Sequence, residues 1–248
     1  MGLHPLAAQF AGVAEVYERG RPGYAPAVVG ALSAELGLAP GARVLDLAAG
    51  TGKLTRALVG GGLDVVAVEP LAELRAVLEA TVGAERVVEG VAEAIPLPDA
   101  SVDAVTVADA FHWFDAEPAL AEIGRVLRPG GGLALLSTAP DWRDAPWGHE
   151  LGTLIADMRT EHPYFDGTPW QQTLAAAPGF GVPRDVQVIT RQETDPERIA
   201  AYVQSMSWVA AMEPDVRAGM LARIAELTAG DGPRNLRVRV FMWLSVRG

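Results

Sequence analysis

The chain has no cysteine, and Lys53 is the single lysine among its 20 basic residues. The absence of cysteine excludes disulfides, thiolate nucleophiles and cysteine-based metal sites. The four histidines and the acidic residues show no metal-ligand spacing, so we expect no bound metal. No apolar run reaches the ~20 residues that cross a bilayer, and the first residues lack the pattern of a signal peptide. We therefore expect a cytoplasmic protein that does not bind membranes.

Basic residues are outnumbered by 31 acidic residues, which gives a formal net charge of −11 at pH 7. Nucleic-acid binding needs a basic surface, so this charge argues against that class of protein. Hydrophobic residues make up 50% of the chain, which is ordinary for a globular protein. The expected partner is a small molecule, and the chain is expected to be a monomer or a homodimer.

Short apolar segments alternate with helical patterns through the first half of the chain. These segments are apolar throughout, which is typical of parallel strands covered on both faces. Helices are predicted near 6–18, 26–36, 54–59, 71–78 and 117–127, and strands near 44–47, 65–68, 87–88, 102–107 and 133–136. The sequence thus predicts an α/β fold with a doubly wound, mostly parallel sheet.

The second half is less regular and contains much tryptophan, proline and glycine. Helices are predicted near 149–159, 170–177, 196–206 and 215–228, and strands near 186–190 and 236–246, which bring the sheet to seven strands. Because this half shows no pattern of an independent core, we predict a single domain over 1–248. Its parts are N-terminal helices (1–40), a ligand-binding core (41–139), lid helices with an edge strand (140–235) and a final strand (236–248).

The most informative segment is Asp46-Leu47-Ala48-Ala49-Gly50-Thr51-Gly52, which joins the first predicted strand to the following helix. Its small residues let a ligand approach the backbone closely. A phosphate-binding P-loop would need glycine at Leu47 and Ser or Thr at Leu54, so that interpretation fails.

The dinucleotide pattern G-x-G-x-x-G fits Gly50 and Gly52 but meets Thr55 at its third glycine. Glu69, at the end of the second strand, can accept hydrogen bonds from a ribose diol. Asp46 would repel a pyrophosphate but attract an ammonium or a sulfonium group. The turn therefore favours a cationic adenosine ligand, S-adenosylmethionine (SAM), over NAD.

The segment from Val44 to Thr55 resembles the SAM-binding first motif of class I SAM-dependent methyltransferases. Residues 90–99 and 125–131 are similar to later motifs of that family, and the resemblance spans residues 10–140. It implies a Rossmann-like methyltransferase fold with a helical lid, SAM as the cofactor and S-adenosylhomocysteine (SAH) as its product.

Two further segments are similar to those of a small-molecule branch that includes trans-aconitate methyltransferase-like enzymes. One is Tyr-x-x-x-Arg-Pro-x-Tyr over residues 17–24, and the other is Ala-Phe-His-Trp-Phe over residues 110–114. The resemblance implies a set of cofactor-binding residues: Tyr17, Arg21, Asp46, Ala48, Gly50, Thr51, Gly52, Glu69, Pro70, Ala92, Glu93 and Asp109.

Two positions depart from the family pattern. Ala48 stands where many members have glycine, and Val91 stands where many have aspartate. With Val91 there, the adenine amino group is expected to rely on Glu93 and on the backbone of Ala92. Arg21 is expected to clamp a carboxylate, either of the methionine moiety or of the substrate, with a purely structural arginine as the alternative.

The segment 109–114 follows the fourth strand, and ligands in this fold lie beyond the carboxyl ends of the strands. Ring faces attract cations, so its aromatic residues are expected to surround the sulfonium, unless they are simply core under a lid. His112 is the predicted catalytic residue, as a hydrogen-bond partner of the substrate or as a base. The residues predicted to contact substrate are Tyr24, Phe111, Trp113 and Trp208. Of the other histidines, His4 is expected in a frayed terminus, and His149 and His162 are expected to stand alone in the lid.

The function predicted on these grounds is methyl transfer from SAM to a small-molecule acceptor, at a carboxylate or hydroxyl oxygen. C- or N-methylation of a metabolite stays open. Two other functions also stay open. One is that of an NAD(P)-dependent reductase, although the chain has no Tyr-x-x-x-Lys pair, and the other is that of a SAM-binding protein without turnover.

Overall fold

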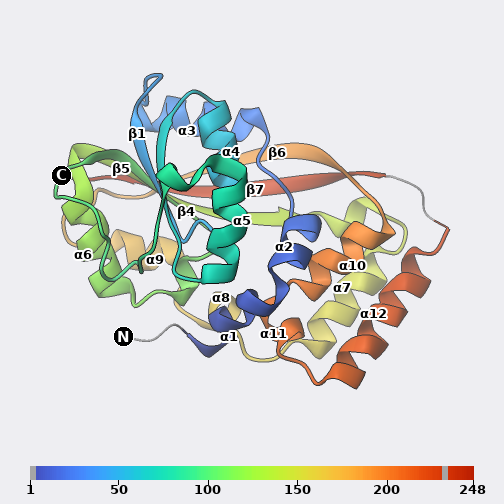
Figure 1. Cartoon of the computed structure of the whole chain (residues 1–248). Helices are drawn as coiled ribbons and strands as arrows, with labels where there is room; N and C mark the ends of the chain where they lie inside the picture. Colours follow the sequence, from blue (N-terminus) through green and yellow to red (C-terminus); the bar gives the residue numbers. More distant parts are fainter. Residues whose placement is uncertain (1–3, 231–233) are drawn as a thin grey trace.

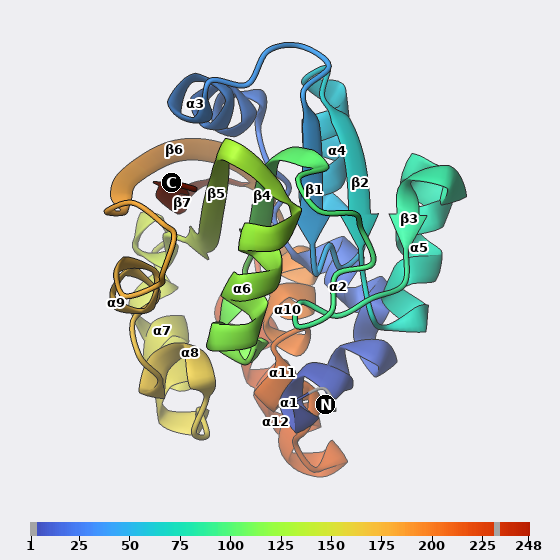
Figure 2. The same cartoon turned by 90° about the vertical axis from the view of Figure 1, so that its left-hand side faces the viewer.

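A computed structural model describes residues 4–230 and 234–248. At its centre lies a seven-stranded sheet in the order β3-β2-β1-β4-β5-β7-β6 (Figure 1), whose strands lie side by side in the turned view of Figure 2. The strands are β1 (Arg43–Leu47), β2 (Asp64–Val68), β3 (Val87–Val88), β4 (Val102–Ala108), β5 (Leu127–Pro140), β6 (Arg184–Thr194) and β7 (Arg234–Val246). The strands β1 to β5 pair in parallel, whereas β7 runs antiparallel to both β5 and β6. The predicted α/β fold with a mostly parallel sheet is confirmed.

The helices fall into two groups along the chain. Those before β5 are α1 (Pro5–Ala8), α2 (Ala14–Gly20), α3 (Pro26–Leu36), α4 (Lys53–Gly60), α5 (Ala72–Val82) and α6 (Ala116–Val126), with the short 3₁₀ segments η1 (Gln9–Val13), η2 (Ala84–Arg86) and η3 (Phe111–Trp113). Those after β5 are η4 (Trp142–Asp144), α7 (Gly148–Met158), α8 (Pro163–Asp166), α9 (Trp170–Ala175), α10 (Pro196–Gln204), α11 (Ser207–Ala210) and α12 (Pro214–Thr228). Among the described residues, no helix combines the length and the apolar character needed to cross a bilayer.

Both faces of the sheet are covered, as the unbroken apolar strands predict. Along β1, Val44 packs with α3 and α4 on one face, whereas Leu45 and Leu47 pack with α6 and α9 on the other. This alternation follows from the two-residue period of a strand. It directs Asp46, which lies between the two leucines, to the face covered by α4.

The N-terminal segment differs from the single helix predicted near 6–18. It is divided into α1, η1 and α2, and Gly12, a poor helix former, lies inside the 3₁₀ part. In Figure 1 these pieces lie between α5 and the helices of the second half, and η1 contacts both α5 and α11. The segment thus bridges the two halves of the chain.

The second half has a hydrophobic cluster of its own, so the expectation that it lacks an independent core is wrong. Leu151 of α7, Val203 of α10 and Ile224 of α12 are fully buried together there, with Trp208 of α11. The sequence pattern did not show it because the cluster is assembled from four helices and from aromatic residues scattered between them. We call the helices α7, α10, α11 and α12 the lid.

Candidate functional site

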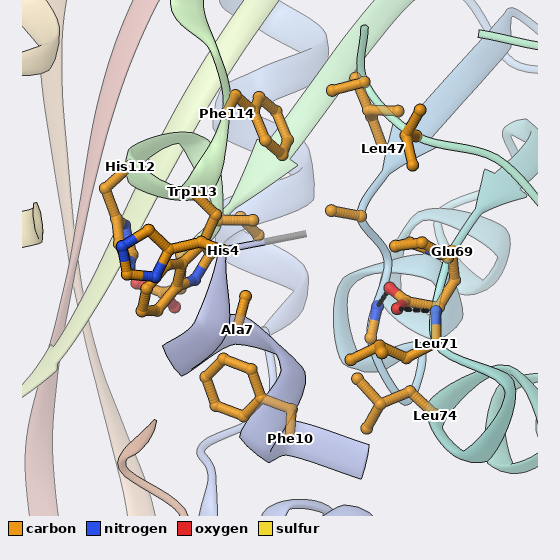
Figure 3. Close-up of a pocket in the computed structure, with 18 of the residues that line it drawn as sticks. His4, Ala7, Phe10, Leu47, Glu69, Leu71, Leu74, His112, Trp113 and Phe114 are labelled. Atoms are coloured by element: carbon orange, nitrogen blue, oxygen red, sulfur yellow. Dashed lines mark hydrogen bonds between the residues drawn. The ribbon is translucent and has the colours of Figure 1, made fainter. Parts of the chain in front are cut away.

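A cavity with a volume of about 420 Å³ lies beyond the carboxyl ends of β1, β2 and β4. Residues from the N-terminal segment, from the loops after these strands and from α5 line it. Figure 3 shows His112, Trp113 and His4 gathered on one side, Glu69, Leu71 and Leu74 across from them, and Ala7 and Phe10 between the two groups. The cavity therefore has an aromatic end and a carboxylate end.

The carboxylate end is organised around Glu69, whose residue is 3% exposed. Its Oε2 accepts a hydrogen bond from the backbone N–H of Gly50 (2.8 Å), and its Oε1 accepts one from the backbone N–H of Leu71 (3.0 Å). Burial raises the pKa of Glu69 to about 7, against the lowering effect of these two hydrogen bonds. The carboxylate holds the glycine turn in place and keeps lone pairs for a ligand hydroxyl.

Two residues that are not glycine have left-handed backbone conformations at this edge of the sheet. Ala48 directly follows β1 with φ 55°, and Asp109 directly follows β4 with φ 52°. Such conformations cost about 1–2 kcal/mol and cluster at ligand sites. The φ of Ala48 also explains why glycine suits this position in the family pattern. Both residues line the cavity.

Asp46 lies beside the main cavity. It is 1% exposed, and its carboxylate accepts hydrogen bonds from the hydroxyls of Thr55 (2.6 Å) and Thr106 (3.1 Å). Burial raises the pKa of Asp46 to about 6. Thr55, which stands where the dinucleotide pattern has its third glycine, thus holds the carboxylate of Asp46 through a hydrogen bond. Asp46 lines a small cavity of about 30 Å³ that shares Tyr17, Ala48 and Asp109 with the main cavity.

Arg21 lines the same small cavity, and among the residues that the structure describes it forms no ion pair with an acidic side chain. Its guanidinium lies between the rings of Tyr17 (5.2 Å) and Tyr202 (4.8 Å). Its Nε donates to the hydroxyl of Ser205 (2.8 Å), and one terminal nitrogen donates to the carbonyl of Ser205 (3.3 Å). Arg21 therefore ties α2 to the end of α10.

The aromatic end is built around His112. Its ring lies 4.4 Å from that of Trp113 and is stacked on Trp170 at 5.8 Å with an angle of 13° between the planes. Its Nδ1 is buried and has no hydrogen-bond partner among the described residues 4–230 and 234–248. Burial lowers the pKa of His112 to about 3, with smaller contributions from His162, Arg21 and His4. The imidazole is neutral at physiological pH.

Two other histidines belong to this end, which corrects two expectations. His4 does not fray away: its ring packs against Trp113 at 5.2 Å and lines the cavity. His162 does not stand alone: it lies 5.3 Å from His112 and 5.0 Å from Trp113. The Nδ1 of His162 accepts from the backbone N–H of Tyr164 (3.2 Å), which leaves Nε2 to donate to the hydroxyl of Ser207 (3.1 Å).

The structure brings together most, but not all, of the predicted site residues. The predicted residues that line the main cavity are Tyr17, Ala48, Gly50, Glu69, Pro70, Ala92, Glu93, Asp109, His112 and Trp113. The predicted residues that do not are Arg21, Tyr24, Asp46, Thr51, Gly52, Phe111 and Trp208. Tyr24 donates to Asp109 (3.4 Å) and lines the small cavity with Arg21 and Asp46.

Four of these outlying residues are explained by packing. Phe111 (3% exposed) lies in the core under α6 and α9, and Trp208 (4% exposed) lies in the lid cluster, so neither reaches the cavity wall. Thr51 is fully buried. Gly52 has a φ of 85°, a left-handed conformation that favours glycine, and a Cβ there would stand 2.5 Å from the side chain of Leu78.

Several lining residues escaped the sequence analysis. Those from outside the motifs are His4, Ala7, Phe10, Leu71, Leu74, Asp115 and Pro163. The signal that could have found the first three is the amphipathic N-terminal pattern, but nothing in it shows which surface it covers.

The comparisons with known proteins agree with this geometry. A family profile described as a methyltransferase domain matches residues 45–135. An uncharacterized methyltransferase of Mycobacterium tuberculosis (strain ATCC 25618 / H37Rv) is 40% identical over 224 residues, which cover 90% of this chain and 87% of that protein. The chain belongs to the class I SAM-dependent methyltransferases. This membership decides against the reductase, and SAM is the cofactor of this methyltransferase.

Solved structures show the same fold. A structure from Anaeromyxobacter dehalogenans, provisionally described as a type II methyltransferase, is 26% identical with a TM-score of 0.65, covering 92% of this chain and 97% of that one. A phosphoethanolamine N-methyltransferase of Haemonchus contortus, solved with SAH, shares the fold at 17% identity and a TM-score of 0.53, covering 98% of this chain and 57% of that one. The placement of this methyltransferase in the trans-aconitate-like branch stays a prediction.

The affinity of the methyltransferase for SAM is expected to rise as the pH increases from about 5.5 to about 7. Asp46, with a pKa raised to about 6, and Glu69, with a pKa raised to about 7, lose their protons in this window. We expect both ionised forms to attract the cationic ligand, and we expect that of Glu69 to accept hydrogen bonds from its ribose. Calorimetric titration across this range measures the effect, and equal or tighter binding at the acidic end would contradict it.

The contribution of Asp46 and Glu69 to the free energy of unfolding of the ligand-free protein should fall as the pH rises, whereas the affinity for SAM should increase. Both acids have folded-state pKa values above their ordinary values, so the folded state binds more protons than the unfolded state between about pH 4 and pH 7. Their contribution to stability is present at the acidic side of this window and is lost as the pH rises through it. Urea unfolding of the ligand-free protein with and without Asp46→Asn separates this contribution from those of other groups.

The rings of His112 and His162 are expected not to titrate between about pH 5.5 and pH 8. Burial lowers the pKa of His112 to about 3 and that of His162 to about 4, so both stay neutral throughout this range. NMR of the ring C–H signals, assigned by their loss in His112→Asn and His162→Asn, tests this. A midpoint near the ordinary histidine pKa of about 6.5 for either ring would contradict it.

Proposed function

We propose that this methyltransferase transfers the methyl group of SAM to an oxygen of a small-molecule acceptor that enters the His112 end of the cavity. The observation that carries the proposal is the continuity of one cavity from Glu69 to His112. A nucleoside whose ribose is held at Glu69 places its sulfonium toward His112. The cofactor supplies an activated methyl group, so the protein contributes mainly alignment.

The residues at the carboxylate end fit an adenosine. Glu69 accepts from the ribose diol, while Leu71, Leu74 and Ala92 offer apolar walls for the base. Glu93 lies beside them, with one oxygen accepting from the backbone N–H of Asp115 (2.9 Å). Its remaining lone pairs are available to the adenine amino group, which Val91 does not bind.

Arg21 is assigned to the carboxylate of the methionine moiety and not to that of the acceptor. It shares the small cavity with Asp46 and Ala48 at the end of β1, and it does not line the His112 end. Arginine between two tyrosine rings keeps a fixed orientation, which suits recognition of a carboxylate. Asp46, which also lines this small cavity, suits the ammonium group.

Two measurements test the proposal. Titration calorimetry should show heat with SAM and with SAH and none with NADH. A screen of small hydroxyl and carboxyl compounds with radiolabelled SAM should then yield labelled product. Tight binding of SAM with no labelled product from any acceptor would instead support a SAM-binding protein without turnover.

A further inference from the structure

A separate cavity, with a volume of about 250 Å³, lies where the end of α2 meets α10, β6 and β7. We call it the α2–α10 cavity; these two helices lie side by side in Figure 1 and contact each other. It has no lining residue in common with the main cavity. It does share Arg21, Pro22, Lys53 and Tyr202 with the small cavity that contains Asp46. A ligand in the α2–α10 cavity would therefore lie beside the proposed methionine end of the cofactor and outside the main cavity.

Cationic side chains predominate in the α2–α10 cavity. It is lined by four cations and two carboxylates, which belong to Arg19, Arg21, Lys53, Arg198, Glu18 and Glu193. The chain as a whole has the opposite balance, with 20 basic and 31 acidic residues. Cations that converge on one cleft raise the local concentration of anions. The α2–α10 cavity is therefore suited to an anion, in a protein whose net charge repels anions.

Two of these cations can bind an anion without losing a contact that they already have. Arg19 forms no hydrogen bond or ion pair with any residue in 4–230 and 234–248. Lys53 donates to the carbonyl oxygen of Glu18 (2.7 Å) and lies 3.5 Å from its Oε1, whereas an ammonium group has three N–H donors. The side chain of Lys53 is 13% exposed, so an anion bound to it would be partly shielded from water.

The negative charge near Lys53 is not enough for the cations around it. Glu18 is shared, because its Oε1 also pairs with Arg56 at 2.7 Å. Burial lowers the pKa of Lys53, Glu18 raises it, and the guanidinium groups of Arg56 and Arg198 lower it again. An anionic ligand would supply the missing counter-charge.

Much of the remaining wall is apolar. Trp142 and Tyr202, whose rings meet edge to face at 5.3 Å, line it together with Ile199, Leu236 and Val238. Such a wall stabilises a ligand by removing hydrocarbon from water, and its rings favour a further ring. The combination with cations therefore fits an anion that carries an apolar body, and an inorganic ion would leave this wall unused.

Contacts within the protein hold the walls in place. The side chain of Gln192 accepts from the backbone N–H of Gly23 (3.0 Å) and donates to its carbonyl, which joins β6 to the segment after α2. The bond from Arg21 to the hydroxyl of Ser205 joins the same segment to α10. A site that is formed before its ligand arrives loses less entropy on binding.

We propose that the α2–α10 cavity is a second ligand site that binds a small organic acid, with its carboxylate at Arg19 and Lys53 and its apolar body against Trp142 and Tyr202. The acid is bound without a chemical step. It is not the acceptor, which the proposed function places at the His112 end of the main cavity.

The single lysine gives a direct readout of this cavity. In protein labelled with ¹³C at lysine, Lys53 supplies the only lysine CεH₂ signal, and the shift of that signal during a titration gives the affinity at this site. The protein is saturated with SAH, so that the place of the methionine carboxylate is filled. The probes are 3-phenylpropanoate, its neutral amide 3-phenylpropanamide, and inorganic phosphate, which has no apolar body. We expect the propanoate to bind about tenfold more tightly than either of the others, because only it has both the charge and the ring.

The absence of a shift of the Lys53 signal with the propanoate would overturn the proposal, as would equal or tighter binding of the amide or of phosphate. So would a shift that appears in the ligand-free protein and is abolished by SAH, because the acid would then occupy the carboxylate site of the cofactor. Transfer of a labelled methyl group from SAM to the propanoate would make it the acceptor and would likewise overturn the second site. A protein that binds no SAH overturns the proposed function alone, and titration of the ligand-free protein then tests the α2–α10 cavity.

A variant tests the contact with Arg19. Arg19→Gln removes a cation that has no partner in the described part of the chain, so the fold should be unaffected. We expect it to weaken the binding of the propanoate by about fivefold and to leave the affinities for the amide and for SAH within about twofold. The matched control is Arg43→Gln at the amino end of β1, which removes the same charge away from this cavity and should leave the propanoate affinity within about twofold. Equal losses in the two variants would show an effect of net charge only and would overturn the assigned contact.

Discussion

Replacing Glu69 by glutamine is expected to weaken the binding of SAH by about 100-fold. The wild-type carboxylate accepts from two backbone donors, Gly50 and Leu71, and in the proposed complex it also accepts from the ribose diol. An amide has one oxygen and one NH₂ group, so one backbone N–H would face another donor. The loss of a charged hydrogen-bond acceptor, at about 1.5–3 kcal/mol, accounts for a change of this size. Calorimetric titration with SAH measures it.

The matched control is Glu73→Gln on the exposed face of α5, close by in the chain. It removes the same charge at the same end of the sheet but leaves the cavity unchanged, so the affinity for SAH should stay within about twofold. If both variants lose affinity equally, the effect of Glu69 would be one of net charge only, and its role as ribose acceptor would be wrong.

The second large effect is expected for Gly20→Ala. Gly20 ends α2, where a Cβ would collide with the backbone of Ala201 and Tyr202, at 2.7 Å from the Cα of Tyr202. Backbone atoms of a packed helix do not move aside as a flexible side chain does, so α2 and α10 must separate. We expect a loss of about 3 kcal/mol in the free energy of unfolding. For a chain of this size that lowers the Tm by about 6–12 °C.

The same substitution should also weaken the binding of SAM. Tyr17 and Arg21 lie close to Gly20 in the chain, on the segment that we propose covers the cofactor. The contacts of Arg21 with Ser205 and Tyr202 depend on the close approach of α2 and α10. Gly30→Ala in α3 is the control, because a Cβ there meets nothing within 4 Å. Its Tm should be unchanged or slightly higher, since alanine is the better helix former. A Gly20→Ala protein with the wild-type Tm and SAM affinity would show that the close contact of α2 with α10 is not needed for either property.

The first prediction concerns a residue that lines the main cavity, and the second concerns a packing contact outside that cavity. Glu69 belongs to a motif that is local in the sequence, whereas Gly20 acts through a contact with residues about 180 positions away. A binding site of this kind therefore depends on the lid as much as on the sheet.

The sheet and the glycine turn were predictable because they rest on local rules. Apolar runs such as Val44–Leu47 have the period and length of buried strands, and the position of Glu69 after β2 follows from the parallel arrangement alone. The left-handed φ of Ala48 was not visible in the pattern, because an alanine there looks like any small residue. The broken N-terminal helix was missed for a similar reason: the apolar spacing near Phe10 fits a continuous helix, and its contacts with α5 and α11 decide otherwise.

By itself, the sequence determined the class of fold, because strand periodicity acts over a few neighbouring positions, and it determined the family through the resemblance of the segment between Val44 and Thr55. Only the tertiary structure decided that Asp46 faces α4 beside the main cavity, that Trp208 belongs to the lid cluster, and that His4 and His162 join His112. These placements depend on packing between segments far apart in the chain, where shape and burial, and not local periodicity, select which side chains meet.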